Sequence, residues 1–331
     1  MSKSAVQKIY NDLLGNVGKG PIISGEEYQL LMNNLHLLSS SEIIHFQAKV
    51  VEYILSHMNN TIECDNSLIG HGNPHFGDCF EYILGFHRNP LKIGDLLGLE
   101  LKIWGKKSQL SIFTYSAEKE LSQISNTPTN DYLCAKQKKG SKCTSAICIE
   151  PNRHIIKMNE GICYDLPNRL NKLKYNIDDA GVLHWSYREN VNKEWQEFSN
   201  LDINQKLVKY NHGLLLASIS GERKDRKFKF TKLYYIPMSP NSIIEIIKDG
   251  NANYEMRYKK DKINGIWDGV SFRSPGWGFR LSPSWVRNNL MIEKYQINDI
   301  NDFLKLRYTI ENNQDINFKV NNEDSDLNSF F

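Results

Sequence analysis

The chain lacks the long apolar runs that mark membrane proteins and secretion signals. No window reaches the roughly 18 apolar residues that a membrane-spanning helix needs, and residues 1–7 carry no apolar signal core. Of the 331 residues, 40% are hydrophobic and 24% are charged, which is typical of a globular protein large enough to bury a substantial core. We therefore expect a cytoplasmic protein without a membrane partner.

The chain also lacks the short paired cysteines that are usual in a zinc module. Four of its six cysteines lie in the middle of the chain with 8, 4 and 14 residues between them: Cys134, Cys143, Cys148 and Cys163. We expect no zinc site there. Without a secretion signal, the six cysteines are predicted to be reduced thiols.

A strong net charge is absent as well. The 41 Lys and Arg residues nearly balance the 38 Asp and Glu residues, which leaves a formal net charge of +3. The composition therefore neither requires nor excludes a nucleic-acid partner, because local clustering decides. Residues 136–142 form a basic loop that includes Lys138 and Lys139. Such a loop either stays solvated or contacts phosphates.

The chemistry that is present centres on residues 94–104, an apolar run that carries Asp95, Glu100 and Lys102. Because side chains alternate along a strand, Glu100 and Lys102 share one face. The other face carries the apolar residues Leu99, Leu101 and Ile103. Two carboxylates and a lysine around one point are able to hold a hard divalent cation and activate a water molecule. The alternative is an ordinary ion pair on a surface strand.

Neighbouring residues extend this pattern into a resemblance to a known family. Gly77 and Glu81 form a G-x-x-x-E pattern, and Asn89 and the Asp…Glu-x-Lys residues follow in order. In this respect the chain resembles the PD-(D/E)xK nucleases, and more narrowly the MvaI/BcnI group of type II restriction endonucleases and their mismatch-repair relative MutH. Residues 276–281 are similar to the G-x-x-F-R element of those enzymes, although Pro275 replaces a histidine that the family often has. The resemblance covers residues 70–116 and 210–290.

The resemblance implies a sequence-specific, Mg²⁺-dependent endonuclease that cuts double-stranded DNA and leaves 5′-phosphates, with Mn²⁺ able to replace Mg²⁺. Asp95 and Glu100 would bind the metal together with the main-chain carbonyl of Leu101. Lys102 would orient or deprotonate the attacking water or offset charge on the phosphate, and Glu81 would hold a water at the metal. A cognate DNA methyltransferase would act in the same system without a stable complex, and the enzyme would work as a monomer or a homodimer.

Two other functions stay open on the sequence. One is a MutH-like endonuclease that nicks one DNA strand during repair, and the other is a DNA-binding protein without catalytic activity. Cleavage of a plasmid in Mg²⁺ excludes the non-catalytic protein, and a linear rather than a nicked product excludes the nicking enzyme.

Sequence reading by such an enzyme requires donors that reach the major groove, where arginine is the commonest reader of guanine. The C-terminal third supplies the predicted base contacts Arg257, Lys259, Arg273 and Arg280. Lys138 and Lys139 are predicted to contact phosphates. The alternative for the strand residues is solvent-exposed charge, and for Arg280, between Phe279 and Leu281, a paired structural arginine.

The order of predicted elements indicates an α/β fold: a PD-(D/E)xK restriction-endonuclease-like core with a mixed sheet flanked by helices. A capping box from Ser39 to Glu42 marks the start of one N-terminal helix. Apolar alternation slips once within the strand that runs from Phe228 to Tyr235. Helices are predicted at 4–14, 26–37, 39–58, 76–87, 239–250 and 283–291, and strands at 95–104, 109–115, 214–220, 228–235, 254–259, 265–272 and 278–281.

Five regions are predicted along the chain. They are an N-terminal helical region packed on the core (1–65), the first part of the catalytic core (66–125), an insertion (126–205), the rest of the core with the DNA-recognition elements (206–311) and a polar tail (312–331). Within the insertion, the aromatic residues around Trp185 form either a stacking surface or a core.

Overall fold

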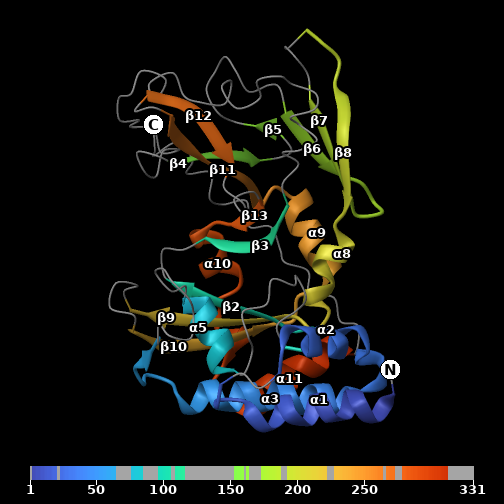
Figure 1. Cartoon of the computed structure of the whole chain (residues 1–331), viewed down its shortest axis with the longest axis vertical. Coiled ribbons are helices and arrows are strands. Elements are labelled where there is room, and N and C mark those ends of the chain that lie inside the picture. The colour runs from blue at the N-terminus through green and yellow to red at the C-terminus, as the bar shows by residue number, and fades with distance from the viewer. Residues whose placement is uncertain are drawn as a thin grey trace. The chain divides into compact units, whose positions relative to one another are not determined.

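A computed structural model describes residues 2–20, 23–64, 76–84, 96–105, 109–115, 153–159, 162–163, 173–187, 192–221, 227–263, 266–272 and 278–311. The chain forms two compact units (Figure 1). The first comprises residues 1–108, 206–242 and 283–316, and the second comprises residues 109–205, 243–282 and 317–331. Among the described helices, none combines the length and the hydropathy needed to cross a bilayer.

The first unit contains a mixed sheet in the order β1-β10-β9-β2, with β14 also pairing with β10. β2 runs parallel to β9, and the other pairs are antiparallel. The prediction of a mixed sheet is therefore confirmed. The strands are β1 (Ile62–Glu63), β2 (Glu100–Gly105), β9 (Leu214–Ser220), β10 (Lys227–Ile236) and β14 (Gln296–Ile297).

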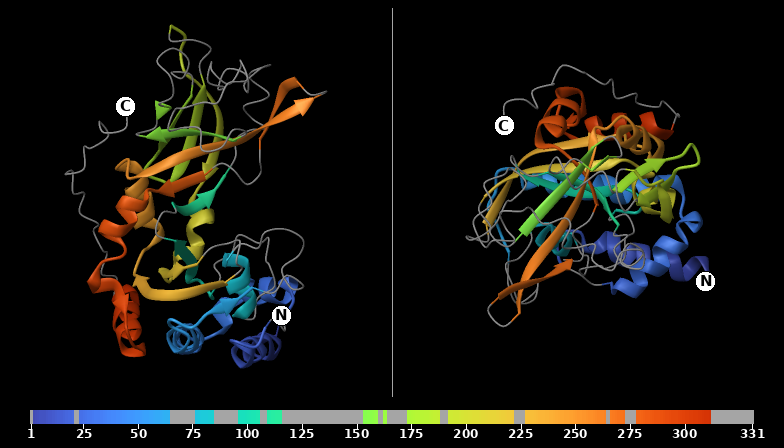
Figure 2. Two further views of the ribbon diagram at one scale, coloured as in Figure 1. Left: turned by 90° about the vertical axis from the view of Figure 1, so that its left-hand side faces the viewer. Right: turned by 90° about the horizontal axis from the view of Figure 1, so that it is seen from above.

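Helices flank this sheet, as predicted. In two perpendicular views α1, α3 and α11 lie together on one side of it (Figures 1 and 2), and α3 and α11 both contact β10, while α5 contacts β2. The helices are α1 (Lys3–Asn16), α2 (Gly25–Asn33), α3 (Ser40–Ser56), α5 (Phe76–Ile83), α10 (Pro283–Asn289) and α11 (Ile300–Glu311). Short helical turns are η1 (Leu35–Leu37), η3 (Val208–Tyr210) and η5 (Glu293–Tyr295), and α8 (Asn204–Leu207) and α9 (Pro240–Lys248) extend across the boundary between the units.

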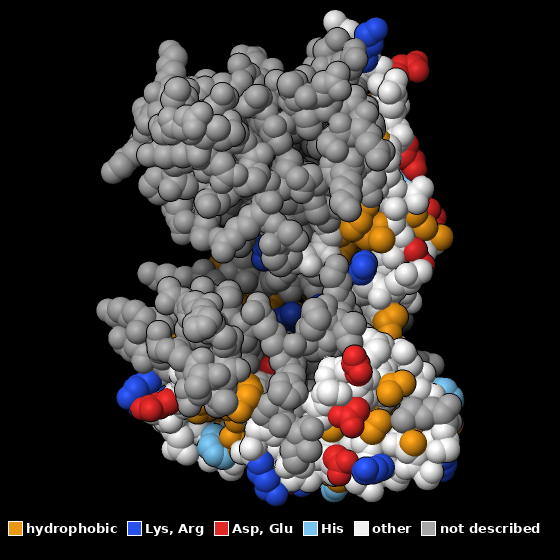
Figure 3. Space-filling model, in the orientation of Figure 1, with side chains coloured by type: hydrophobic (Ala, Val, Ile, Leu, Met, Phe, Trp, Pro, Cys, Tyr) orange, Lys and Arg blue, Asp and Glu red, His pale blue; other side chains and the backbone are white. Residues whose placement is uncertain are grey.

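The N-terminal helices form where their caps and apolar spacing predict them. The Ser39 side chain accepts from the Glu42 N–H at 3.3 Å, and the Glu42 carboxylate accepts from the Ser39 N–H at 2.8 Å, which is the predicted capping box. The apolar faces of α1, α2 and α3 are buried in one cluster with β10. On the solvent side, acidic and basic side chains lie close together (Figure 3). These helices therefore act as a scaffold for the sheet.

The predicted slip in the strand from Phe228 to Tyr235 is a β-bulge. The pairing of β10 with β9 shifts register between Phe230 and Lys232, so that the buried side chains of Phe228, Phe230, Leu233 and Tyr235 all join the same core cluster. The rings of Phe230 and Phe80 of α5 lie 4.9 Å apart. A single extra residue thus lets a long strand bury one continuous face.

Helix α11 was not predicted by the sequence pattern. It begins after Asp299, whose carboxylate accepts from the backbone N–H groups of Asn301 at 2.8 Å and Asp302 at 3.0 Å. Its Phe303 ring lies 5.1 Å from that of Tyr235. The sequence therefore contained an aspartate cap for this helix. The helix was missed because its apolar face is narrow and gives a weak helical pattern.

The second unit is built on a single antiparallel sheet in the order β3-β13-β11-β4-β5-β6-β7-β8, with β12 also pairing with β11. Strands from the predicted insertion (126–205) share this sheet with strands from both flanking regions. The predicted strand 109–115 pairs with β13 rather than with the strand that carries Glu100. The strands are β3 (Leu110–Thr114), β4 (Arg153–Asn159), β5 (Ile162–Cys163), β6 (Leu173–Ile177), β7 (Val182–Tyr187), β8 (Gln196–Asp202), β11 (Ala252–Ile263), β12 (Ile266–Phe272) and β13 (Gly278–Leu281).

An aromatic core holds this second sheet together. Trp185 is 1% exposed, and its ring lies 5.5 Å from Tyr175 and 4.6 Å from Tyr254. Phe279 of β13 contacts both tyrosines, at 5.2 and 5.0 Å. Of the two predicted roles for these aromatic residues, the core is correct at Trp185.

A disulfide bond joins Cys64, just after β1, to Cys79 of α5. The prediction of six reduced thiols is therefore wrong at these two positions. The fold brings two buried cysteines to a Cα–Cα distance of 5.6 Å, which is within bonding range. Cys134, Cys143 and Cys148 lie outside the described residues, and only the backbone of Cys163 is described, so the prediction about zinc stays a prediction.

We expect Cys79→Ser to lower the free energy of unfolding of the oxidised protein by about 3 kcal/mol, because a bond that closes a short loop restricts the unfolded chain. Denaturation by urea, with and without dithiothreitol, measures the effect. Reductant should remove the difference between Cys79→Ser and the unsubstituted protein, and an equal difference in both conditions would exclude the bond as its source.

Candidate active site

A tight turn, Leu96–Leu99, directly precedes the strand that carries Glu100. The Leu96 N–H donates to the Leu99 carbonyl at 3.0 Å, and the Leu99 N–H donates to the Leu96 carbonyl at 3.3 Å. Leu97 has φ 52° and Gly98 has φ 92°, as the two central residues of a type I′ turn require. Glycine adopts such a φ freely, whereas a leucine there costs about 1–3 kcal/mol and needs support from its surroundings. The neighbouring structure therefore holds this turn in place.

Glu100 begins strand β2, and its carboxylate is buried, with 2% of the residue exposed. Its Oε1 lies 2.5 Å from Nζ of Lys102 and 2.6 Å from Nζ of Lys209. Lys102 lies on the same strand face, as the alternation predicted, and Lys209 belongs to the helical turn η3 ahead of β9. One buried carboxylate oxygen is thus shared by two ammonium groups.

The ionisation of Glu100 follows from this arrangement. Burial of the carboxyl group opposes its charge and by itself raises the pKa, but the Lys102 and Lys209 ammonium groups outweigh burial and hold the pKa below its usual range. Glu100 is therefore a carboxylate at neutral pH. Two ammonium groups thus stabilise the charge of one buried carboxylate.

The opposite face of the strand is apolar, as predicted. Leu99 and Leu101 are buried in the core cluster, and Ile103 packs against it. The predicted separation of the two faces is therefore confirmed. The ion pair between Glu100 and Lys102 is not the surface pair of the alternative interpretation, because its carboxylate is 3% exposed.

Lys209 was missed by the sequence analysis. It lies 109 residues from Glu100, and nothing in its neighbourhood marks it apart from other lysines. The pairing of β2 with β9, in which Glu100 lies beside Leu214, brings the segment ahead of β9 to the carboxylate. Only knowledge of that parallel pairing would have identified Lys209.

The structure describes only some of the other residues in the predicted motif. Glu81 lies half-buried in α5, the helix that contacts β2, whereas Asp95 and Asn89 lie outside the described residues. Within the described ranges, no three His, Cys, Asp or Glu side chains gather in a metal-binding group. Glu100 supplies an oxygen donor of the kind that Mg²⁺ accepts, and Asp95 immediately precedes the turn in the sequence.

Two solved structures are similar to this chain. The complex of restriction endonuclease MvaI with its cognate DNA substrate superimposes with a TM-score of 0.46 at 15% identity, and covers 78% of this chain and 98% of that one. MvaI in the absence of DNA gives a TM-score of 0.36 at 14% identity with the same coverage. Neither a family model nor a curated protein sequence matches the chain.

The predicted DNA-contacting residues fall into three groups. Arg257 and Lys259 belong to strand β11, and Arg273, Lys138 and Lys139 lie outside the described residues. Arg280 lies in β13 between β11 and β3, opposite Asn253 and Ser111, and is 9% exposed. A base-reading arginine must reach solvent, so burial favours the structural alternative for Arg280.

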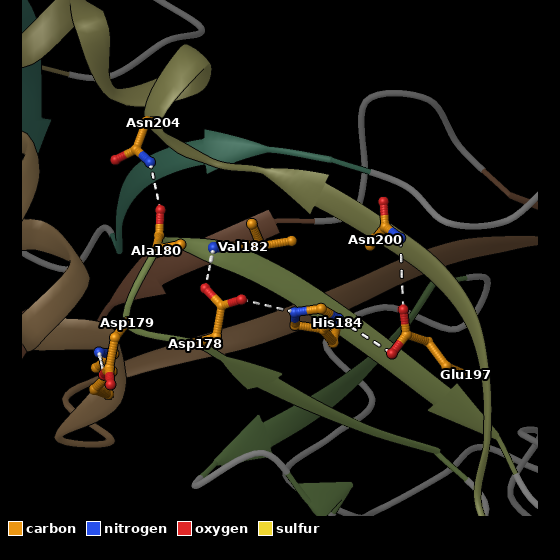
Figure 4. Close-up of polar contacts among 9 residues, drawn as sticks. Asp178, Asp179, Ala180, Val182, His184, Glu197, Asn200 and Asn204 are labelled. Carbon is orange, nitrogen blue, oxygen red and sulfur yellow. Dashed lines mark hydrogen bonds and ion pairs between the residues drawn. The ribbon is translucent and has the colours of Figure 1, made fainter.

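A second polar cluster surrounds His184 in the second unit (Figure 4). One ring nitrogen lies 3.1 Å from Asp178 and the other lies 3.1 Å from Glu197, while Asp178 also accepts from the Val182 N–H at 2.8 Å. The hydrogen bonds to Asp178 and then to Glu197 raise the pKa of His184. The two carboxylates lie on opposite edges of one ring, an arrangement that links β8 to the β6–β7 hairpin and is not that of ligands around a metal.

Proposed function

We propose that this protein is a sequence-specific endonuclease that hydrolyses double-stranded DNA in the presence of Mg²⁺ and leaves 5′-phosphates. The observation that carries the proposal is the buried, ionised Glu100, held by two lysines at the end of a strained turn. A buried carboxylate is expensive to desolvate, and strained turns and perturbed ionisable groups cluster at active sites. The motif resemblance over residues 70–116 supports the same function.

The metal would be held by the carboxylates of Asp95 and Glu100 and by the main-chain carbonyl of Leu101. These are hard oxygen donors, which suit Mg²⁺ and also Mn²⁺. When bound, the ion polarises a phosphate oxygen and offsets the charge of the reacting phosphate.

The chain's own residues would orient the reactants. Lys102 would hold the attacking water in line with the P–O3′ bond. The water would give up a proton to solvent as its oxygen bonds to phosphorus, the P–O3′ bond would break, and the departing 3′ oxygen would take a proton from solvent, so that the phosphate stays on the 5′ end. Lys209 would hold Glu100 in position and add positive charge beside the pentacovalent phosphate. Glu81 would hold an ordered water at the edge of the site.

Base recognition would fall to Arg257, Lys259 and Arg273, with Lys138 and Lys139 on phosphates. The proposed system partner is a cognate DNA methyltransferase that forms no stable complex, and the working state is a monomer or a homodimer.

Digestion of a sequenced supercoiled plasmid in Mg²⁺ tests the function. We expect discrete linear fragments whose mapped ends share one sequence and carry 5′-phosphates, and no cleavage in EDTA. Asp95→Ala is the matched variant, because loss of a metal-binding carboxylate should remove cleavage and leave DNA binding in place. A product that stays nicked would favour the strand-nicking alternative, and folded protein that cuts no DNA in Mg²⁺ or Mn²⁺ would overturn the proposal.

A further inference from the structure

A network of buried polar side chains contacts the Leu96–Leu99 turn, which precedes Glu100. Its members are Gln47 of α3, His212 just ahead of β9, and Arg307 of α11. Gln47 is 0% exposed and Arg307 is 3% exposed. None of these residues belongs to the motif at residues 95–102, and all of them lie in the first unit.

Gln47 is the centre of the network. Its side-chain Nε2 donates to the Leu96 carbonyl at 3.0 Å and lies 3.4 Å from the Leu97 carbonyl. The same Nε2 lies 3.2 Å from Nδ1 of His212. At the other end of the amide, Nε of Arg307 donates to Oε1 of Gln47 at 3.1 Å. The side chain of Gln47 therefore connects α11 to both carbonyl groups at the start of the turn.

The orientation of the Gln47 amide is determined by its partners. An arginine has only donors, so the amide oxygen must face Arg307 and the NH₂ group must face the turn. With the NH₂ group on this side, a neutral His212 ring is able to accept at Nδ1. Burial, together with the nearby Arg307 charge, lowers the pKa of His212 to about 4, in agreement with a neutral ring.

Other members of the same unit hold the remaining polar groups of the turn. The His212 N–H donates to the Gly98 carbonyl at 2.8 Å, and the Tyr28 hydroxyl accepts from the Leu97 N–H at 3.4 Å. A Cβ atom at Gly98 would lie 3.3 Å from Nδ1 of His212, so the ring packs directly on the turn. The turn is thus tied to three separate segments of the chain.

Burying polar side chains costs folding free energy, because they lose their hydrogen bonds to water and must find partners in the core. A network at this position therefore indicates a specific role. The point of attachment is informative: the bonds hold a leucine at positive φ, three residues before the proposed metal ligand.

We propose that Gln47 is a positioning residue for the nuclease reaction, and that its amide holds the Leu96–Leu99 turn so that Glu100 stays fixed at the metal site. This inference rests on the proposed function for the role of Glu100. The claim that Gln47 holds the turn stands on the contacts alone.

The test is Gln47→Glu, which keeps the size of the side chain and the acceptor for Arg307 but removes the donor to the turn. We expect the rate of single-turnover cleavage to fall by about 10- to 100-fold, as for other groups that orient a metal ligand. The Mg²⁺ concentration for half-maximal rate should rise several-fold, while the Kd for DNA in Ca²⁺ stays within about twofold. Gln29→Glu, the same change at a surface helix position where Gln29 bonds to Asn33, should change none of these.

Hydrogen exchange supplies a measurement that needs no substrate. We expect the amides of residues 97–100 to exchange at least about 10-fold faster in Gln47→Glu, while those of β10 keep their wild-type rates. A purely structural role would lower the melting temperature and speed exchange everywhere, without changing the Mg²⁺ dependence of the folded protein. Faster exchange throughout the protein with unchanged Mg²⁺ dependence would overturn the proposal. Folded Gln47→Glu that cleaves DNA and exchanges its turn amides at wild-type rates would overturn it as well.

Two further results separate the possible failures. If Gln47→Glu does not fold, Tyr28→Phe removes only the acceptor for the Leu97 N–H, and it should shift turn exchange and Mg²⁺ dependence in the same direction by a smaller factor; no shift would refute the proposal. If the unsubstituted protein cuts no DNA, the proposed function fails. Hydrogen exchange then still decides whether Gln47 holds the turn. Mn²⁺ affinity, measured by electron paramagnetic resonance in Gln47→Glu and in the unsubstituted protein, decides whether the held turn contributes to metal binding.

Discussion

We expect Glu100→Gln to lower the rate of the proposed Mg²⁺-dependent DNA cleavage by about 100- to 1,000-fold, the range seen when a key electrostatic group is lost from an active site. Glutamine has the same shape, but its neutral amide cannot supply the negative charge that a cation needs. Binding of DNA should stay unchanged or become tighter, because a carboxylate that would face the phosphates is gone. Single-turnover rates at saturating DNA, together with the Kd measured in Ca²⁺, check both expectations.

The matched control for this change is Glu63→Gln. Glu63 also pairs with a lysine, Lys227, at 2.5 Å, but its side chain is 69% exposed at the edge strand β1. An exposed pair of this kind contributes little, so Glu63→Gln should cut DNA at the wild-type rate. If folded Glu100→Gln kept more than about a hundredth of the wild-type rate, Glu100 would not be a metal ligand.

The second large effect is expected at the two lysines that share Glu100. Lys102→Met should lower the single-turnover rate by about 100-fold, because in the proposed reaction its ammonium group would orient the attacking water and offset phosphate charge. Lys209→Met should lower it by about 10-fold, since Lys209 acts by holding the carboxylate. The double variant tests whether the two lysines act together. If they act independently, the fold-decrease in its rate should equal the product of the fold-decreases in the two single variants.

Lys227→Met controls for the loss of a surface lysine near the same sheet, because its partner Glu63 is exposed. Melting temperatures of all variants must be compared with that of the unsubstituted protein. Replacing either Lys102 or Lys209 removes one partner from the buried Glu100 carboxylate, and this loss alone lowers stability. Wild-type cleavage by folded Lys102→Met would show that this lysine is only a structural partner of Glu100.

The sequence predicted those parts of the site that depend on local periodicity. Alternation in residues 99–103 placed Glu100 and Lys102 on one face, and the slip in alternation before Tyr235 coincides with the bulge in β10. Both signals come from the spacing of neighbouring residues, which a strand converts directly into geometry. The capping box of Ser39 and Glu42 belongs to the same class of local signal.

Several features that sequence patterns missed depend on contacts between separate segments of the chain. Lys209 reaches Glu100 only because β9 runs parallel to β2, and parallel pairing has no local sequence signature. Gln47 resembles any other glutamine in a helix until Arg307 and the turn are placed beside it. The same holds for Cys64 and Cys79, and for the strands of residues 153–202, whose partners lie in β11 and not in their own segment alone.

The long-range contacts around the turn have a consequence for when activity arises during folding. The bond between Gln47 and Arg307 spans 260 residues of chain, and the pair of Glu100 with Lys209 spans 109. Loops of this length close slowly and late, after local helices and hairpins have formed. A growing chain that already contains residues 95–102 therefore has neither its second lysine nor the helix that secures its turn. If the proposed function is correct, cleavage competence should appear only once α11 has docked on α3, and a partly synthesised chain should leave nearby DNA intact.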